Sequence, residues 1–114
     1  MNERTMEFSL RVVRLYTALK GQEEAAVIGK QLLRSATSVG ANYREACHAR
    51  STQEFVARLK ICEAEAAESA YWLELLRRSG IVSSRKLEAL QNEAEQLSAI
   101  FSTSTKEQSS SPHS

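Results

Sequence analysis

Glu45 and His48 are three positions apart, so a helix would place this carboxylate and this imidazole on one face. Such E-x-x-H pairs bind metal in di-iron helical bundles, where a second pair and further inward glutamates complete the site. The chain has no second E-x-x-H, although Glu65 and Glu68 could add carboxylates. The incomplete set favours an exposed pair near a helix end. We predict no metal and no cofactor, with a ferritin-like metal-binding bundle as the remote alternative.

Ser35 and Ser69 are hydroxyls that fall in the apolar repeats of their helices. A nucleophilic serine needs a nearby base and an oxyanion site, and the chain has only two histidines, His48 and His113. A helical serine can instead bond to its own backbone where a second helix comes close. We therefore predict close helix packing at both serines and no enzymatic activity.

Asn42 lies in the apolar repeat between Val39 and Ala46. A buried amide is destabilising unless it is hydrogen-bonded, and in helical bundles it can select the register or the partner. The alternative is a partly exposed asparagine at the edge of the bundle. Charged residues complete a predicted polar network that fixes the bundle geometry: Arg34, Glu45, Glu65 and Glu68.

Three arginines near the turn between the second and third predicted helices are the best candidates for contacting nucleic acid: Arg44, Arg50 and Arg58. The chain has 15 basic and 14 acidic residues and a net charge of +1, whereas nucleic-acid-binding domains usually carry a larger basic excess. The alternative is a set of surface ion pairs, each worth about 0–1 kcal/mol. RNA or DNA is therefore the alternative partner, and a second copy of the chain is the first.

Apolar residues recur every three or four positions in four segments, which predicts helices over 5–20, 23–49, 52–79 and 84–102. Thr5 is the predicted N-cap of the first helix, and Gly21 follows its end. Ser51 and Glu54 form an S-x-x-E capping box before the third helix, and Gly80 ends it. The short connections predict an all-α, up-down-up-down antiparallel four-helix bundle over 1–103, followed by a disordered Ser-rich tail over 104–114.

The second helix carries two adjacent stripes, one with Leu32 and Val39 and the other with Gly29, Ala36 and Gly40. Two stripes predict that this helix is packed from two sides, and small residues let a neighbour approach closely.

The first and fourth predicted helices are shorter than the second and third. We therefore expect them to leave the far end of the long pair uncovered, as an interface with another subunit. Its candidate residues are Tyr43, Cys47 and Phe55.

The two cysteines form no disulfide framework, which is typical of a reducing cytoplasm. The polar start of the chain predicts no signal peptide and no membrane partner.

The stretch 31–46, QLLRSATSVGANYREA, resembles a bacterial family of four-helix bundles first noted as proteins encoded by intervening sequences in large-subunit ribosomal RNA genes. The matching residues include Gln31, Arg34, Ser35, Asn42 and Glu45. A second matching block has these residues: Phe55, Leu59, Glu65, Glu68, Ser69, Tyr71, Trp72, Leu73 and Leu75.

The resemblance covers roughly residues 8–101 and implies a bundle without known enzymatic activity. The chain is similar also to the accessory variability determinant of diversity-generating retroelements. That similarity implies a cyclic homo-oligomer, such as a pentamer, and a reverse transcriptase and nucleic acid as further partners.

Overall fold

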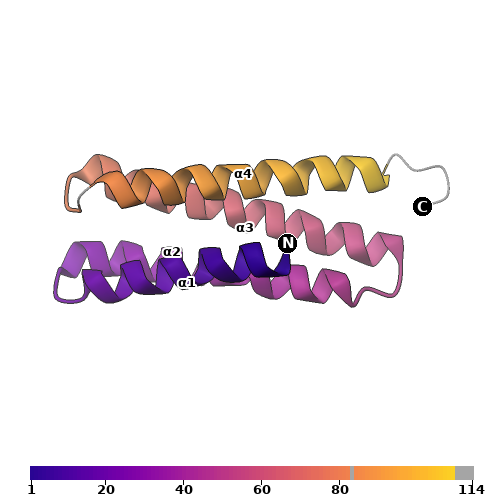
Figure 1. The fold of residues 1–114 in the computed structure, drawn as a ribbon, viewed down its shortest axis with the longest axis horizontal. Coiled ribbons are helices and arrows are strands. Elements are labelled where there is room, and N and C mark those ends of the chain that lie inside the picture. Colours follow the sequence, from indigo (N-terminus) through magenta and orange to yellow (C-terminus); the bar gives the residue numbers. More distant parts are fainter. Residues whose placement is uncertain (83, 110–114) are drawn as a thin grey trace.

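Four α-helices make up the structure, a computed structural model that describes residues 1–82 and 84–109. They are α1 (Asn2–Leu19), α2 (Glu23–Cys47), α3 (Thr52–Ser79) and α4 (Ser84–Ser109). Figure 1 shows them as antiparallel neighbours in a rod that measures 51 × 21 × 20 Å. The predicted all-α four-helix bundle is confirmed. Within the described ranges, no helix has the length and apolarity that a membrane crossing requires.

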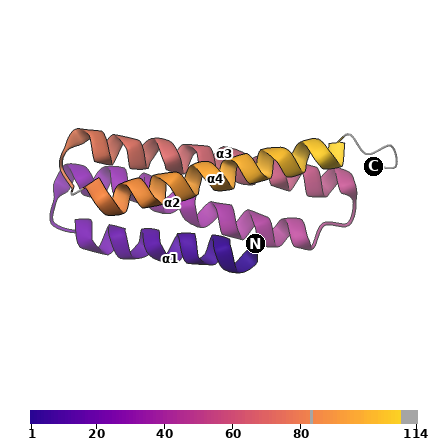
Figure 2. The same ribbon diagram turned by 45° about the horizontal axis from the view of Figure 1, so that its top comes forward.

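The helices pack in chain order around the bundle. α1 lies against α2, α2 against α3 and α3 against α4, whereas α1 and α4 touch only briefly (Figures 1 and 2). One charged pair joins these last two helices: Arg4 Nε and Nη2 donate to the two carboxylate oxygens of Glu93 at 2.7 and 2.9 Å. α1 and α3 are consequently diagonal, and the side between α1 and α4 is the loosest.

Each helix contributes its three-four apolar repeat to one core. The fully buried large side chains include Phe8 and Leu19 on α1, Leu32 on α2, Leu73 on α3 and Phe101 on α4. Cys62, also fully buried, fills the space beside α2, where its thiol contacts the Val39 carbonyl at 3.6 Å. The core follows the stripes predicted from spacing.

Small residues bring α1 close to α2. A Cβ added at Gly29 would lie 2.9 Å from Leu19 Cδ1 and 3.2 Å from Tyr16 Cδ1. At Gly40, an added Cβ would lie 3.4 Å from Thr5 Oγ1 of α1. The two-sided packing predicted for α2 is thus confirmed.

The predicted ends of α3 are confirmed at both sides. The hydroxyl of Ser51 accepts a hydrogen bond from the Glu54 backbone N–H at 3.0 Å, which caps the first turn. The Glu54 carboxylate accepts from the Arg50 backbone N–H rather than from that of Ser51. Gly80 ends the helix in the left-handed conformation with φ of +73°.

The predicted start of α1 is wrong. α1 begins at Asn2, and Thr5 is not an N-cap but a buried residue of the first turn, 1% exposed. Its hydroxyl donates to the Met1 and Asn2 carbonyl oxygens, both at 3.1 Å. Because those local bonds satisfy the hydroxyl, threonine can face Gly40 inside the bundle.

α4 extends seven residues beyond its predicted end at Ser102. Residues 104–109, expected in the disordered tail, are helical, and 110–114 lie outside the described residues. The reason is that Phe101 and Thr105 continue the buried repeat of α4. The longer α4 also reaches the far end of α2 and α3, so only α1 stops short of it (Figure 1). The expectation that both outer helices leave this end uncovered is therefore corrected.

Candidate functional site

A polar cluster joins the exposed edges of α2 and α3. Arg34 Nη1 donates to Glu65 Oε2 at 3.1 Å, and Arg34 Nη2 donates to Glu68 Oε2. Trp72 Nε1 donates to the same Glu68 oxygen at 2.9 Å. The Trp72 hydrogen bond, followed by Arg34, lowers the pKa of Glu68 below its ordinary range. The hydrogen bond to Glu68 is likewise the main cause of the raised pKa of Arg34.

This cluster contains three of the five residues predicted to form a polar network. Asn42 and Glu45 lie outside it, and Trp72 is the member that sequence reasoning did not include. Indole N–H groups usually find a polar partner when they are partly buried, which was the available signal. Because the Arg34 side chain is 52% exposed, these ion pairs add little stability and mainly orient side chains.

Asn42 is half-buried and fully bonded within its own chain. Its Nδ2 donates to the Ser38 carbonyl and hydroxyl, both at 2.9 Å, and its Oδ1 accepts from Arg58 Nη1 at 3.0 Å. The amide therefore ties α2 to α3 at the bundle's edge. Its role in selecting a partner stays a prediction.

Ser35 and Ser69 meet between α2 and α3, where both are 0% exposed. Their hydroxyls share a hydrogen bond of 2.9 Å. Each hydroxyl also lies within hydrogen-bond distance of a carbonyl in its own helix, Ser35 of Leu32 at 3.2 Å and Ser69 of Glu65 at 2.8 Å, so the serine that donates to the other shares its proton with its own carbonyl. The close helix approach predicted at these serines is confirmed.

Glu45 and His48 are both exposed near the end of α2. His48 Nδ1 donates to the Arg44 carbonyl at 2.8 Å, which occupies one ring nitrogen. Glu45 has no side-chain hydrogen bond or ion pair to any described residue. Within 1–82 and 84–109, no cluster of three or more His, Cys, Asp or Glu residues could hold a metal ion.

The three arginines proposed to contact nucleic acid do not share one environment. Arg44 and Arg50 are exposed, on α2 and in the α2–α3 turn, whereas Arg58 is partly buried and donates to Asn42. The structure therefore leaves two of the three guanidinium groups open at this end.

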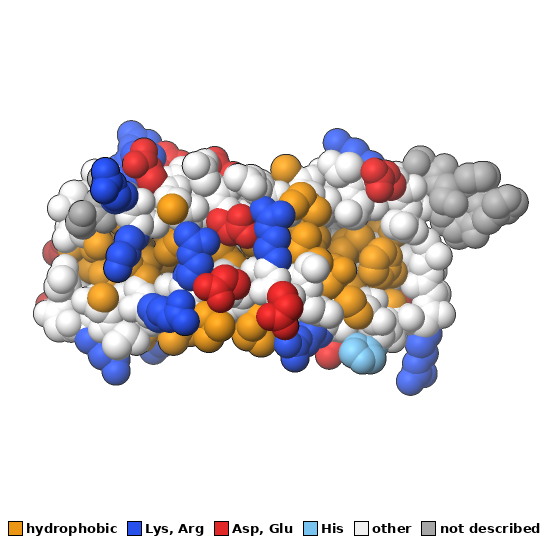
Figure 3. All heavy atoms as spheres, viewed as in Figure 1, with side chains coloured by type: hydrophobic (Ala, Val, Ile, Leu, Met, Phe, Trp, Pro, Cys, Tyr) orange, Lys and Arg blue, Asp and Glu red, His pale blue; other side chains and the backbone are white. Residues whose placement is uncertain are grey.

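The candidate interface residues also differ in exposure. Tyr43 and Phe55 are half-buried against the bundle's own core, and the Tyr43 ring lies 5.9 Å from that of Phe101 on α4. Cys47 is exposed, and Asn2 Nδ2 contacts its sulfur at 3.9 Å. Figure 3 shows apolar atoms at this end, where α1 has stopped and α4 continues.

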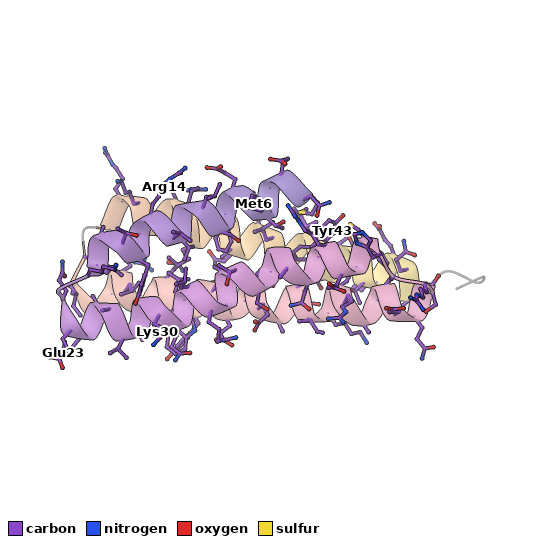
Figure 4. All side chains as sticks on the ribbon, turned by 90° about the horizontal axis from the view of Figure 1, so that it is seen from below. Met6, Arg14, Glu23, Lys30 and Tyr43 are labelled. Atoms are coloured by element: carbon purple, nitrogen blue, oxygen red, sulfur yellow. The ribbon has the colours of Figure 1, made fainter. Side chains whose placement is uncertain are left out.

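Two outward apolar rows are more exposed than Tyr43 and Phe55, and sequence reasoning missed both. On α1, Met6, Leu10 and Val13 are 39%, 40% and 43% exposed; on α3, Ile61 and Tyr71 are 41% and 58% exposed. Figure 4 views α1 and α2 from the side on which Met6 is labelled. Three-four spacing was the available signal, because it recurs on α1 in a second register.

Comparison with known proteins agrees with the fold and with the resemblance. A family model described as 23S rRNA-intervening sequence protein matches residues 1–103. A solved structure of a protein with unknown function from the S23 ribosomal protein family of Bacteroides thetaiotaomicron VPI-5482 has 37% sequence identity and a TM-score of 0.85. That match covers 92% of this chain and 97% of the other. No curated protein gives a significant match. Because the family model spans nearly the whole described bundle, the chain belongs to the 23S rRNA-intervening sequence protein family.

Proposed function

We propose that this protein is a non-enzymatic helical bundle that self-associates into a closed ring of identical copies and works as a scaffold or binding module. A pentamer, which the resemblance implies, is one such ring. The observation that carries the proposal is the second apolar face of α1.

α1 is amphipathic in two directions. Phe8 and Val12 point into the core, whereas Met6, Leu10 and Val13 point outward. At about 100° per residue, the two sets face directions roughly 150° apart. A helix that only closes a bundle needs one apolar face. The second face therefore supports contact with a partner.

The outward row on α1 is continuous along the helix, unlike the single exposed apolar residues that are normal on protein surfaces. Covering part of each side chain contributes about 0.5–1.5 kcal/mol per residue at roughly 25 cal/mol per Å². Three adjacent contacts of this size, repeated around a ring, are enough to matter for association.

A groove beside this row gives another helix room to approach. It has a volume of about 340 Å³ and runs between α1 and α2. Its α2 wall is made largely of small residues: Thr37, Gly40 and Ala41. Small side chains at a helix contact permit short distances between the helix axes.

The proposal is tested with the complete chain by sedimentation velocity and light scattering from 1 µM to 200 µM. We expect one discrete species whose mass is a whole multiple of 12.7 kDa. A species of 12.7 kDa throughout this range would contradict self-association. An open ladder of sizes would contradict a closed ring.

A second candidate function is nucleic-acid binding, which the open groove between α1 and α4 favours. This groove holds about 330 Å³, and Arg11, Arg14 and Lys86 line it together with Leu15 and Leu90. Figure 3 shows basic side chains on both sides of an apolar band on this face. Arg11 and Lys86 form no ion pair with any described residue, so both charges are available to phosphates.

Binding of a labelled single-stranded RNA at 50 mM and 200 mM salt tests this second function. We expect affinity to fall steeply with salt and to weaken further in the double variant Arg11→Gln/Lys86→Gln. Arg44→Gln/Arg50→Gln tests the other end of the molecule, where Arg44 and Arg50 are the predicted contacts. An RNA that fails to bind at 50 mM salt would remove this candidate.

A further inference from the structure

We propose that α1 of one copy packs in parallel against α3 of the next copy, with the outward row of α1 lying on the outward row of α3. The inference rests on the proposed self-association and names the two surfaces that meet. It commits to a second copy of this chain as the partner, because the chain itself carries both surfaces.

The α3 row has the same three-four spacing as the α1 row. It consists of these residues: Ile61, Ala64, Glu68, Tyr71 and Leu75. Ile61, Ala64 and Tyr71 are exposed, and Leu75 is half-buried. Glu68 is the one charged member, and Arg34 and Trp72 already occupy its carboxylate. Its charge is therefore compensated before any partner arrives, which leaves its methylene groups to pack.

Both rows lean towards α2 and away from α4. On α1, the outward row lies beyond Ser9, whose hydroxyl donates to the Ala36 carbonyl of α2 at 3.4 Å. On α3, it lies beside Glu65, which faces α2 and accepts a hydrogen bond from Arg34. At about 100° per residue, each row lies about 150° from the core face of its own helix; because α1 and α3 are diagonal and both rows lean towards α2, the two rows are about 120° apart.

The angle between the two surfaces decides what the contact builds. A head-to-tail contact between two different surfaces closes into a ring when the rotation permits it. The two surface normals then meet at about 90° in a ring of four and about 108° in a ring of five. The observed arrangement suits a small ring, with α2 facing the axis and α4 facing outward.

The two rows also lie at the same level, that is, at the same position along the long axis of the bundle. Ser9 meets Ala36, and the adjacent Ser35 meets Ser69 on α3, so Ser9 is level with the Glu68–Ser69 turn. One turn further along both helices, Val13 is level with Tyr71. Rotation about an axis parallel to the bundle leaves levels unchanged, and α1 and α3 run in the same direction. Ring formation thus brings Val13 of one copy to Tyr71 of the next.

The other end of the two rows also brings apolar side chains together. Thr5 lies against Gly40, and Asn42, half a turn further along α2, meets Arg58. Met6 of one copy therefore falls near Ile61 of the next, so that two apolar side chains meet.

The size of the contact predicts how the ring assembles. A helix of 18 residues is about 27 Å long, and a strip roughly 15 Å wide covers about 400 Å² on each partner. One such contact is smaller than most stable interfaces, which cover about 1,200 Å² or more in total. A copy in a closed ring makes two contacts, whereas a terminal copy in an open chain makes one. We therefore expect the ring without a stable dimer.

Disulfide cross-linking tests the pairing. In a Cys47→Ser background, we introduce Val13→Cys and Tyr71→Cys into one chain. Cys62 can stay, because burial raises its pKa to about 11 and keeps it unreactive. Mild oxidation should give covalent dimers, trimers and larger species up to the size of the ring. Either cysteine alone should give monomers.

Two controls separate this pairing from others. Val13→Cys with Ile61→Cys changes the level by ten residues, about 15 Å, and should give no cross-link. Efficient dimers from Val13→Cys alone would instead show α1 packing on α1 about a two-fold axis and would overturn the inference. Cross-linking of the shifted pair as strongly as the predicted pair would overturn it as well.

Surface substitutions give an independent test. Leu10→Lys and Tyr71→Lys should each dissociate the ring into monomers while the helical circular dichroism stays unchanged. Asn92→Lys on the exposed side of α4 is the matched control and should keep the ring. A ring that survives both Leu10→Lys and Tyr71→Lys refutes the inference but leaves self-association standing. A wild-type monomer refutes both.

Discussion

The buried hydroxyl pair between α2 and α3 predicts an unusual double-mutant cycle. Ser35 and Ser69 are fully buried and bonded to each other, and each hydroxyl also has a carbonyl partner in its own helix. Removing one serine thus breaks the bond between the helices without leaving the other hydroxyl unsatisfied. The remaining hydroxyl still has its carbonyl partner. A buried polar group left without any partner would instead cost about 1–3 kcal/mol.

Two terms give the expected magnitude. The lost hydrogen bond costs about 1 kcal/mol, and alanine in place of serine returns roughly 0.5 kcal/mol of helix propensity. Ser35→Ala and Ser69→Ala should therefore each lower the free energy of unfolding by about 0.5 kcal/mol. The second substitution has no bond between the helices left to remove, so the double variant should be close to wild type. The coupling energy is about 1 kcal/mol.

Urea unfolding of the four proteins at one fixed concentration measures this coupling, since self-association makes stability depend on concentration. Ser35→Ala combined with Ser98→Ala is the matched control, because the Ser98 hydroxyl donates to the Glu63 carbonyl at 3.2 Å in a separate contact. That combination should be additive within about 0.5 kcal/mol. A loss above 2 kcal/mol in either single variant, or additivity of Ser35 and Ser69, would refute the reasoning.

Three further predictions concern single contacts, each read from unfolding free energies. Thr105 Oγ1 is buried without a hydrogen-bond partner among the described residues, so Thr105→Val should stabilise the protein by about 1 kcal/mol. Trp72→Phe removes a hydrogen bond that lowers the pKa of Glu68. At pH 7 the substitution should lower the free energy of unfolding by about 0.5–1 kcal/mol. This difference should shrink as the pH falls through the lowered pKa, because the carboxylate is then protonated in both proteins. A pH-independent loss would assign the effect to packing alone. Gly40→Ala should be more stable than Gly29→Ala by about 1 kcal/mol, because both gain helix propensity but only Gly29 has an atom within 3.0 Å of the new Cβ. Equal values would count against a tight α1–α2 contact at Gly29.

The helix ends show which local signals can be interpreted from sequence. Ser51 and Gly80 mark α3 correctly, because each meets a local requirement: an acceptor for a free N–H, and a left-handed backbone. Thr5 misleads, because the same hydroxyl that caps a helix can bond to carbonyls one turn earlier. The Ser-rich end of α4 misleads in the opposite way. Its composition is typical of disorder, but Thr105 adds one more buried position to the repeat.

The candidate site depends on helix rotation, which spacing alone does not determine. Arg34 had Glu45, Glu65 and Glu68 as possible carboxylate partners, and only packing α2 on α3 selects the last two. The same limit applies to α1, where two apolar rows exist and either could have faced the core. Periodicity predicts that an apolar row is buried. Whether the row faces the core or a partner depends on where the neighbouring helices lie.

The small residues of α2 connect the inside of the bundle to its assembly. Gly29 and Gly40 let α1 approach on one side, and the Ser35–Ser69 pair lets α3 approach on the other. α1 and α4 hardly touch, and a groove of about 330 Å³ stays open between them. The open side of the bundle therefore lies between α1 and α4, away from α2, which suits a ring with α2 on the inside. Enlarging α2 at Gly29 should then do more than destabilise the monomer: by moving α1 outward it changes the angle between the two apolar rows, and with it the number of copies that close the ring.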